Sequence, residues 1–158
     1  MDDESLWLLP QLIRAQRVAS LGTLRDGAPF VSMVLYAPAE DFRSYYMHTS
    51  RLAYHTQDIQ RDPRVSLMIA EADDATRDPQ TLARISIMGA ATICAVEDAD
   101  YVVARGAYLA RFPELAFTFG FGDFALYRIT AESARYVAGF ARAFTLTPAR
   151  LAQASRIA

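Results

Sequence analysis

The strand-like segments of this sequence are apolar on both of their faces. In one segment Phe30, Val34 and Tyr36 alternate with Val31, Met33 and Leu35, and in another Ile85, Ile87 and Ile93 alternate with Met88, Ala90 and Cys94. Helices would cover both faces of a parallel sheet, but here only two helices interrupt about six strands. Closure into a barrel fills one face, and a second subunit can cover the other. We therefore expect a mainly β protein, a small antiparallel barrel that forms a homodimer through its outer wall.

Turn and helix signals give the order of the elements. Asp26-Gly27 predicts a hairpin, Asp62-Pro63 ends a helix, and Gly89 predicts a bulge or bend. The expected elements are a helix over Glu4–Val18, strands over Ala19–Leu24, Pro29–Ala37 and Tyr45–Thr49, a helix over Arg51–Arg61, strands over Val65–Ala70 and Leu82–Val96, a helix from Asp98 or Asp100 to Phe112, and a strand over Phe124–Val137. At 158 residues the chain is long enough for one core, so we expect a single domain over 1–158, with an N-terminal helix over 1–17 and a C-terminal tail over 138–158 within it.

The composition excludes several classes of function. All sixteen cationic side chains are arginine, so no lysine can form a Schiff base. A net charge of −2 without basic runs gives no general attraction for nucleic acid. Cys94 is the single cysteine, which rules out an intramolecular disulfide. The acidic N-terminus is unlike a secretory signal and no apolar run is long enough to span a membrane, so we expect a cytoplasmic protein.

One segment, Ser44 to Ile69, brings a strand end, several hydroxyls and a helix start together. The first turn of a helix has unpaired N–H groups and a partial positive charge, so it binds phosphate well. The side chains that would assist are Thr49, Ser50, His55 and Thr56. In the alternative interpretation Thr49 or Ser50 is only a helix cap and His55 an ordinary surface histidine.

Several motifs, in this order, carry a resemblance to a known family. They are SLGTL, DGAPFVS, HTSRLAYHT, DPRVSL, ARISIMGAATI, YVVARGAYLARFP, DFALYRI and RYVAGFARAF. Together they resemble the FMN-binding split barrels of the pyridoxamine 5'-phosphate oxidase-like family over residues 17–146, most closely the haem-utilisation (HugZ-like) branch. The resemblance implies a six-stranded antiparallel Greek-key split barrel with flanking helices and FMN in a groove between two subunits.

The resemblance also implies cofactor contacts. The matching positions are Ser32, Met33 and Val34 on the second strand, His48, Thr49 and Ser50 at the end of the third, His55 and Thr56 on the following helix, Arg84 on the long strand, and Phe140 and Arg142 beside Gly139 in the tail. Backbone groups of the second strand would pair with the edge of the flavin ring, and a His55 imidazolium would contact the phosphate. Arg84 would lie near the pyrimidine end of the ring, and the tail would reach the partner subunit's flavin. The alternatives are ordinary strand pairing or core packing for the second-strand residues, a solvated side chain for Arg84, and a tail that packs on its own chain.

The predicted function is that of an FMN-binding flavoprotein, a flavin-dependent oxidoreductase acting on an unidentified small molecule with no side chain required as general base. The true oxidases have an arginine and a lysine on the second strand and an Arg-x-His-x-Arg tail, whereas this chain has VSMVLYA and GFARAF, so pyridoxamine-phosphate oxidation is not expected. Haem-degrading relatives usually add a C-terminal extension with a haem-ligating histidine, and no histidine follows Ala143. Haem binding through the same ligand is therefore not expected. A haem-binding or haem-utilisation protein is the alternative function, with a non-catalytic FMN-binding module and a dimeric scaffold without cofactor as further possibilities. The phenylalanines at 117, 119, 121 and 124 either line a pocket beside the flavin or make dimer contacts, and two histidines without a third ligand do not predict a metal site.

Overall fold

A single curled antiparallel sheet organises the molecule. The structure, a computed structural model, describes residues 1–157. Its elements are α1 (Asp3–Ala15), β1 (Val18–Arg25), β2 (Ala28–Leu35), β3 (Ala37–Pro38), β4 (Ser44–Ser50), α2 (Tyr54–Arg61), β5 (Arg64–Ala70), η1 (Pro79–Thr81), β6 (Arg84–Cys94), α3 (Tyr101–Arg111), η2 (Pro113–Gly120), β7 (Phe124–Val137), β8 (Ala143–Leu146) and α4 (Pro148–Ser155).

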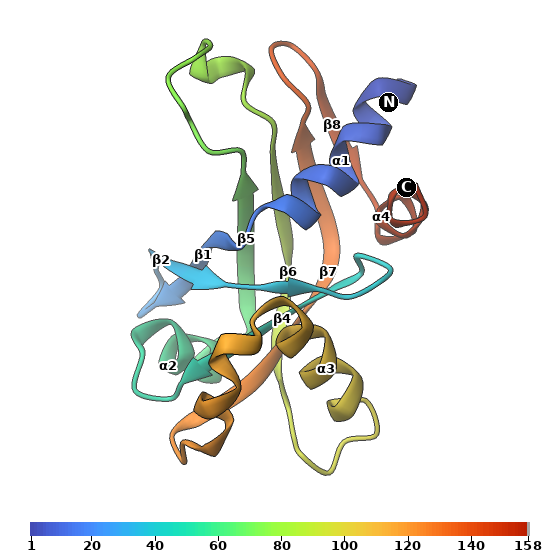
Figure 1. Cartoon of the computed structure of the whole chain (residues 1–158). Helices are drawn as coiled ribbons and strands as arrows, with labels where there is room; N and C mark the ends of the chain where they lie inside the picture. The colour runs from blue at the N-terminus through green and yellow to red at the C-terminus, as the bar shows by residue number, and fades with distance from the viewer. Residues whose placement is uncertain (158) are drawn as a thin grey trace.

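The strands lie in the order β2-β1-β5-β6-β7-β4-β3, and β8 also pairs with β7. β2 and β4, far apart in this order, approach each other because the sheet curls into a half-barrel with flanking helices. Figure 1 shows α2 and α3 at one end of the long strands and the β7–β8 hairpin at the other, with α1 and α4 packed near that second end. The expected fold class is confirmed, and the short strands β3 and β8 are additions to the six expected.

The inside of the curled sheet is the main core. Leu21, Leu67, Ile85 and Ile129 are fully buried there, and α1 and α4 contribute to the same cluster of side chains. On the outside of β2, β5 and β6 a different set of apolar side chains stays exposed, namely Val31, Met33, Met68 and Met88. The strand pairing places these side chains on one face with only small residues between them, since Ser20 lies between Met33 and Met68, and Gly22 and Ser66 lie between Val31 and Met88. We call these four residues the outer apolar face.

Two local predictions from glycine are confirmed. Asp26 and Gly27 both have positive φ, 51° and 81°, which is the turn geometry that joins two strands with the right twist. The pairing of β6 with β7 shifts register between Met88 and Gly89. A Cβ on Gly89 would overlap the Thr130 carbonyl oxygen, so the bulge brings the two backbones too close for any side chain.

Several predicted boundaries are wrong. The N-terminal helix ends at Ala15 rather than near Val18, which already belongs to β1, and Pro10 lies inside it. Asp100 is the N-cap residue of α3, one of the two aspartates expected there, but its side chain makes no capping hydrogen bond. The tail contains β8 and α4, neither of which was predicted, although Thr147-Pro148 is a recognisable helix start.

Candidate functional site

A cleft between β2, β4 and α2 gathers most of the predicted cofactor residues. Its volume is about 270 Å³, and its lining consists of Met33, Val34, Leu35, Met47, His48, Thr49, Ser50, Ala53, His55 and Phe124. Six of the eleven predicted positions belong to this lining. Because they come from three elements that the curl of the sheet brings together, their meeting is a property of the fold and not of any one motif.

Two polar residues of the cleft lining, Thr49 and His55, belong to a connected set of side chains. The set also includes Ser32 and the buried Thr56 next to the lining, and we call these four residues the hydroxyl–imidazole cluster. The His55 Nδ1 lies 3.1 Å from the Ser32 Oγ, and the His55 Nε2 lies 2.7 Å from the Thr49 Oγ1. The Thr49 hydroxyl is also 3.2 Å from the Thr56 hydroxyl. Since hydroxyls donate or accept, the cluster accommodates either neutral tautomer of His55 or its imidazolium.

Burial lowers the pKa of His55, and the nearby Asp58 carboxylate opposes that effect by raising it. In the free protein His55 is therefore a largely neutral ring at pH 7. A dianionic group bound beside the ring would favour the imidazolium and raise this pKa. The site is thus able to take up a proton when it binds an anion.

The helix that was expected from Arg51 begins at Tyr54. Ala53 is its N-cap residue, and no side chain caps it, so neither Thr49 nor Ser50 acts as the cap. The Ser50 Oγ instead accepts from the Leu52 N–H and donates to the Asp123 carboxylate at 2.6 Å. This local turn delays the helix by three residues and leaves the first turn of α2 without a capping side chain beside His55.

The backbone of β2 faces the cleft with one free edge. β2 is the first strand of the sheet order and pairs only with β1, so within the described residues one row of its N–H and C=O groups has no strand partner. Ser32 to Val34 lie in this stretch. An edge strand of this kind offers alternating donors and acceptors to another strand or to a planar ligand with a similar pattern.

His48 forms the opposite wall of the cleft and is held in an aromatic stack. Its ring lies parallel to Phe119 with centroids 3.7 Å apart. The His48 Nδ1 is 3.1 Å from the Thr118 hydroxyl, which itself donates to the Leu115 carbonyl at 2.7 Å. Because that hydroxyl proton is already used, His48 donates from Nδ1 and keeps a lone pair on Nε2. Burial, with the Arg105 guanidinium nearby, lowers the pKa of His48 to about 4, so the ring is neutral at pH 7.

A second cavity of about 290 Å³ lies beyond His48. Its lining consists of His48, Arg51, Ile93, Cys94, Ala95, Val96, Glu97, Tyr101, Phe119, Phe124, Ala125 and Leu126. His48 and Phe124 line both spaces. Phe119 and Phe124 therefore lie where the pocket interpretation of the phenylalanines placed them, whereas Phe117 and Phe121 remain exposed. The other walls were not predicted, because α3 packs on β4, and β6 lies across β7 from it, only in the folded chain.

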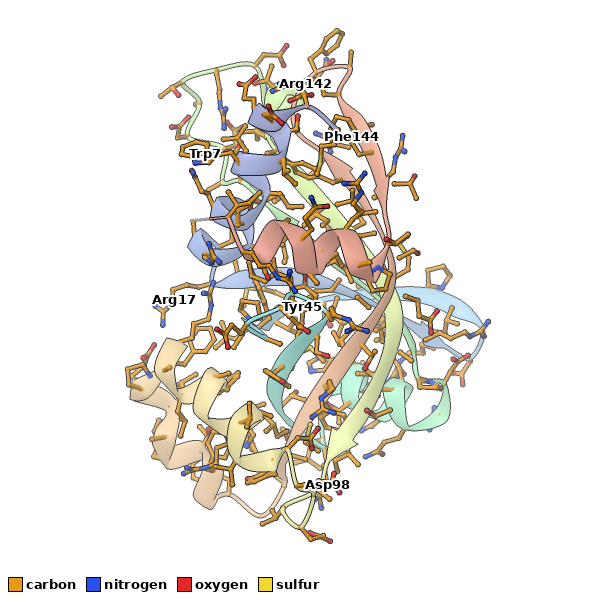
Figure 2. All side chains as sticks on the ribbon, turned by 90° about the vertical axis from the view of Figure 1, so that its right-hand side faces the viewer. Trp7, Arg17, Tyr45, Asp98, Arg142 and Phe144 are labelled. Carbon is orange, nitrogen blue, oxygen red and sulfur yellow. The ribbon has the colours of Figure 1, made fainter. Side chains whose placement is uncertain are left out.

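The remaining predicted residues lie at the other end of the molecule. Arg84 pairs with Val137 at one end of the β6–β7 ladder, whereas His48 lies opposite Leu126 near the other end. Eleven residues of β7 separate these positions, about 35 Å of strand. Figure 2 shows Arg142 at this far end of the long strands and Asp98 at the opposite end.

The β7–β8 hairpin tip has an unusual backbone. Gly139 and Ala141 have positive φ, 139° and 61°, and Phe140 between them is 70% exposed. Arg142 donates to the Glu4 carboxylate at 2.8 Å, so it is paired with α1 of its own chain. Within one chain this tip cannot touch the cleft, and its role at a partner's flavin stays a prediction.

Among residues 1–157 no group of three or more His, Cys, Asp or Glu side chains is arranged to hold a metal ion. In the same part of the chain, no helix combines the length and apolar character needed to cross a membrane.

The fold defines a class of protein, the split β-barrels. Comparison with known proteins makes this more specific, because the sequence pattern of the pyridoxamine 5'-phosphate oxidase family matches residues 9–138. The chain belongs to this family.

Three similar proteins have names or titles that refer to haem. The chain is 41% identical over 121 residues to the chloroplastic non-canonical heme oxygenase HOZ of Arabidopsis thaliana, a match covering 75% of this chain and 35% of that protein. A heme binding protein from Mycobacterium smegmatis superimposes with a TM-score of 0.84 at 25% identity, over 97% of this chain and 62% of that one. The heme storage protein HutZ from Vibrio cholerae has a TM-score of 0.71 at 20% identity over 79% and 88% of the two chains, which supports the fold alone. The chain thus spans about a third of the curated relative and under two thirds of the mycobacterial protein. The cytoplasmic location stays a prediction.

Proposed function

We propose that this chain binds FMN and uses it for two-electron redox chemistry on a small molecule. The observation that carries the proposal is the hydroxyl–imidazole cluster beside the uncapped first turn of α2. Three hydroxyls, an imidazole that can take up a proton and a helix N-terminus form a site suited to a phosphate dianion. Their position inside a cleft, next to the free edge of β2, gives the rest of the cofactor a place to lie.

Each part of the cleft has a separate task in this proposal. The Ser32–Val34 backbone orients the polar edge of the flavin ring, while His48 and Phe124 supply a wall that excludes water. A bound flavin supplies the hydride-accepting ring, and the chain binds, orients and shields it. The cavity beyond His48 provides room for a substrate beside the ring.

We further propose that a second copy of the chain completes the site. The outer apolar face leaves Val31 64% and Met33 70% exposed, on the strand that borders the cleft. A two-fold arrangement through this face would bring the hairpin tip of one copy toward the cleft of the other, because tip and cleft lie at opposite ends of the same strands. Phe140, exposed on a strained tip, is then available to cover the partner's flavin.

Haem is the second candidate, and two observations favour it. The relative at 41% identity and the structural neighbour at 25% both carry haem in their names. In this chain the His48 Nε2 keeps a lone pair and its ring is held rigidly by Phe119 and Thr118, as an iron ligand requires. His55 is less suited, since hydroxyls contact both of its ring nitrogens.

Absorption spectra of the purified protein, with FMN or hemin added, distinguish the two candidates. For flavin we expect a yellow protein that bleaches with dithionite and whose FMN affinity falls further in Thr49→Val than in His48→Gln. For haem we expect a Soret band that is lost in His48→Gln and kept in Thr49→Val. A protein that binds neither ligand would contradict both proposals. The remaining interpretation would then be a dimeric scaffold without cofactor.

Complementation tests the composite site. A variant lacking the cluster, His55→Ala with Thr49→Val, and a variant lacking the tip, Phe140→Ala, should each bind FMN weakly alone. Mixed dimers of the two contain one intact site, so we expect them to recover about half of the wild-type FMN stoichiometry. No recovery in mixed dimers, or a monomer in light scattering, would contradict a site shared between copies.

A further inference from the structure

α2 is attached to the barrel largely through polar side chains. Its buried residues are Thr56, Asp58 and Ile59, of which only Ile59 is apolar. Thr56 contacts Thr49 in the cluster, so one polar contact joins the helix to β4. His55 adds contacts to Ser32 and Thr49, and the Gln60 side chain donates to the Tyr127 hydroxyl at 3.4 Å. Asp58 attaches the middle of the helix to β1. The orientation of this short helix therefore depends on a buried carboxylate that lies outside the cleft.

Asp58 is fully buried, and its two oxygens have different partners on β1. The Thr23 hydroxyl donates to Oδ2 at 2.9 Å, and the Arg25 guanidinium lies 3.1 Å from Oδ1. Thr23 is itself buried. A buried carboxylate is tolerated only when it is paired and hydrogen-bonded, so these three side chains hold one another in one arrangement.

Arg25 extends this arrangement to the first residue of the helix. Its guanidinium carbon lies 3.8 Å from the centre of the Tyr54 ring, and its NH2 group donates to the Tyr54 carbonyl at 3.3 Å. Tyr54 begins α2 and precedes His55. One arginine on β1 thus contacts both the buried carboxylate in the middle of the helix and the turn that carries the imidazole.

We propose that Asp58, Arg25 and Thr23 form a positioning unit that holds the first turn of α2 and His55 where the flavin phosphate binds. The inference rests on the proposed flavin site and concerns residues that do not touch the flavin. Asp58 acts through the helix. Without its contacts to β1, α2 keeps Ile59 in the core but loses the constraint that aligns its first turn with Ser32 and Thr49.

The direction in which Asp58→Asn changes FMN affinity separates a positioning role of Asp58 from a purely electrostatic one. At about pH 9, where His55 is neutral and gives no imidazolium, a carboxylate behind an anion site only repels the anion, so if charge alone mattered, Asp58→Asn would tighten FMN binding there. A positioning role predicts weaker FMN binding in Asp58→Asn instead. We expect Asp58→Asn and the charge-neutral Thr23→Val each to weaken FMN binding roughly tenfold in fluorescence titrations of the full chain. The matched control is Asp62→Asn, which removes the same charge from the end of the same helix, where Asp62 pairs with the exposed Arg64, and should stay within about twofold of wild type.

A second measurement needs no cofactor. NMR titration of His55 in the FMN-free protein reports the surroundings of the ring, where Asp58 on α2 and Arg25 on β1 are the charged groups and Ser32 and Thr49 the hydrogen-bond partners. Because Asp58 raises the pKa of His55, that pKa should fall in Asp58→Asn and stay unchanged in Asp62→Asn. A general loss of stability would not move it in protein that remains folded by circular dichroism.

The outcomes are distinct. Weaker FMN binding in both Asp58→Asn and Thr23→Val, with a fall in the His55 pKa in Asp58→Asn, supports the positioning unit. Wild-type affinity in Thr23→Val and Asp58→Asn, or tighter binding in Asp58→Asn, overturns it while leaving the proposed function in place. Failure of the wild-type chain to bind FMN overturns the proposed function and this inference together. If Asp58→Asn does not fold, Thr23→Val alone decides, since it keeps both charges.

Discussion

His55→Gln is the change that most directly tests how the cluster binds a phosphate. Glutamine can still hydrogen-bond to the Thr49 hydroxyl, which lies 2.7 Å from the imidazole, but it cannot become cationic. The variant therefore separates the charge of His55 from its ability to form hydrogen bonds. A hydrogen bond to a charged group contributes about 1.5–3 kcal/mol, against about 0.5–1.5 kcal/mol for a neutral one. The midpoints of these two ranges differ by about 1.25 kcal/mol, which corresponds to nearly tenfold in FMN affinity.

The advantage of histidine should depend on pH in a defined direction. Burial lowers the pKa of His55 in the free protein, and a bound phosphate raises it in the complex. Binding is then accompanied by proton uptake, so the contribution of the imidazolium is present at low pH and is lost as the pH rises through the pKa of the complex. We expect wild type to bind FMN roughly tenfold more tightly than His55→Gln at about pH 6 and nearly equally at about pH 9.

Quenching of FMN fluorescence at constant ionic strength measures both affinities, and riboflavin, which lacks the phosphate, is the matched ligand control. Wild type and His55→Gln should bind riboflavin alike at both pH values. A ratio of FMN affinities that does not change with pH, or an equal loss for riboflavin, would refute the assignment of the phosphate to His55.

Three other predictions concern the fold and its assembly. Gly89→Ala should lower the free energy of unfolding by more than about 3 kcal/mol in urea titrations, because the new Cβ overlaps the Thr130 carbonyl; unchanged stability would contradict the close approach at the bulge. For His48, whose pKa falls from 6.5 to about 4 on folding, the unfolded state binds more protons between these values, so stability should decrease as the pH is lowered through this range. In His48→Phe this decrease should be smaller, and an identical pH profile would show that His48 is not its source. Met33→Asp with Met68→Asp should shift the protein from dimer to monomer in sedimentation and weaken FMN binding, whereas an unaffected dimer would remove the outer apolar face from the interface.

The sequence predicted those parts of the site that depend on local patterns. Alternating apolar residues and Asp26-Gly27 were sufficient for the hairpin, and Gly89 for the bulge, because each is determined by a few neighbouring residues. The hydroxyls and His55 were found because a strand end followed by a polar helix start occurs within one short segment. The prediction that Ser32 belongs to the same site depended on the family resemblance, since β2 is over twenty residues away from His55 along the chain.

What could not be predicted depends on contacts between distant elements. The start of α2 was placed three residues early because Ser50 resembles a helix cap, whereas in the fold its hydroxyl is drawn to Asp123. His48 was predicted as a cofactor contact, but its stacking on Phe119 and its low pKa follow from η2 packing over β4. Asp58 gave no signal at all, since a lone aspartate in a polar helix normally faces solvent and only the position of β1 shows that it is buried.

The distribution of polar groups along β7 bears on which arrangement of two copies can form one site. The cluster and His48 lie beside the end of β7 near Leu126, and the tip with Phe140 follows its other end at Val137. A parallel side-by-side pair would place cleft next to cleft and leave both tips in solvent. In the dimer we propose, an antiparallel two-fold pair through the outer apolar face would place each tip near the partner's cleft and would cover the exposed methionines in the same step. One contact surface would then account for both the exposed apolar residues and the strained backbone at Ala141, which is why the interface and the cofactor site should be lost together.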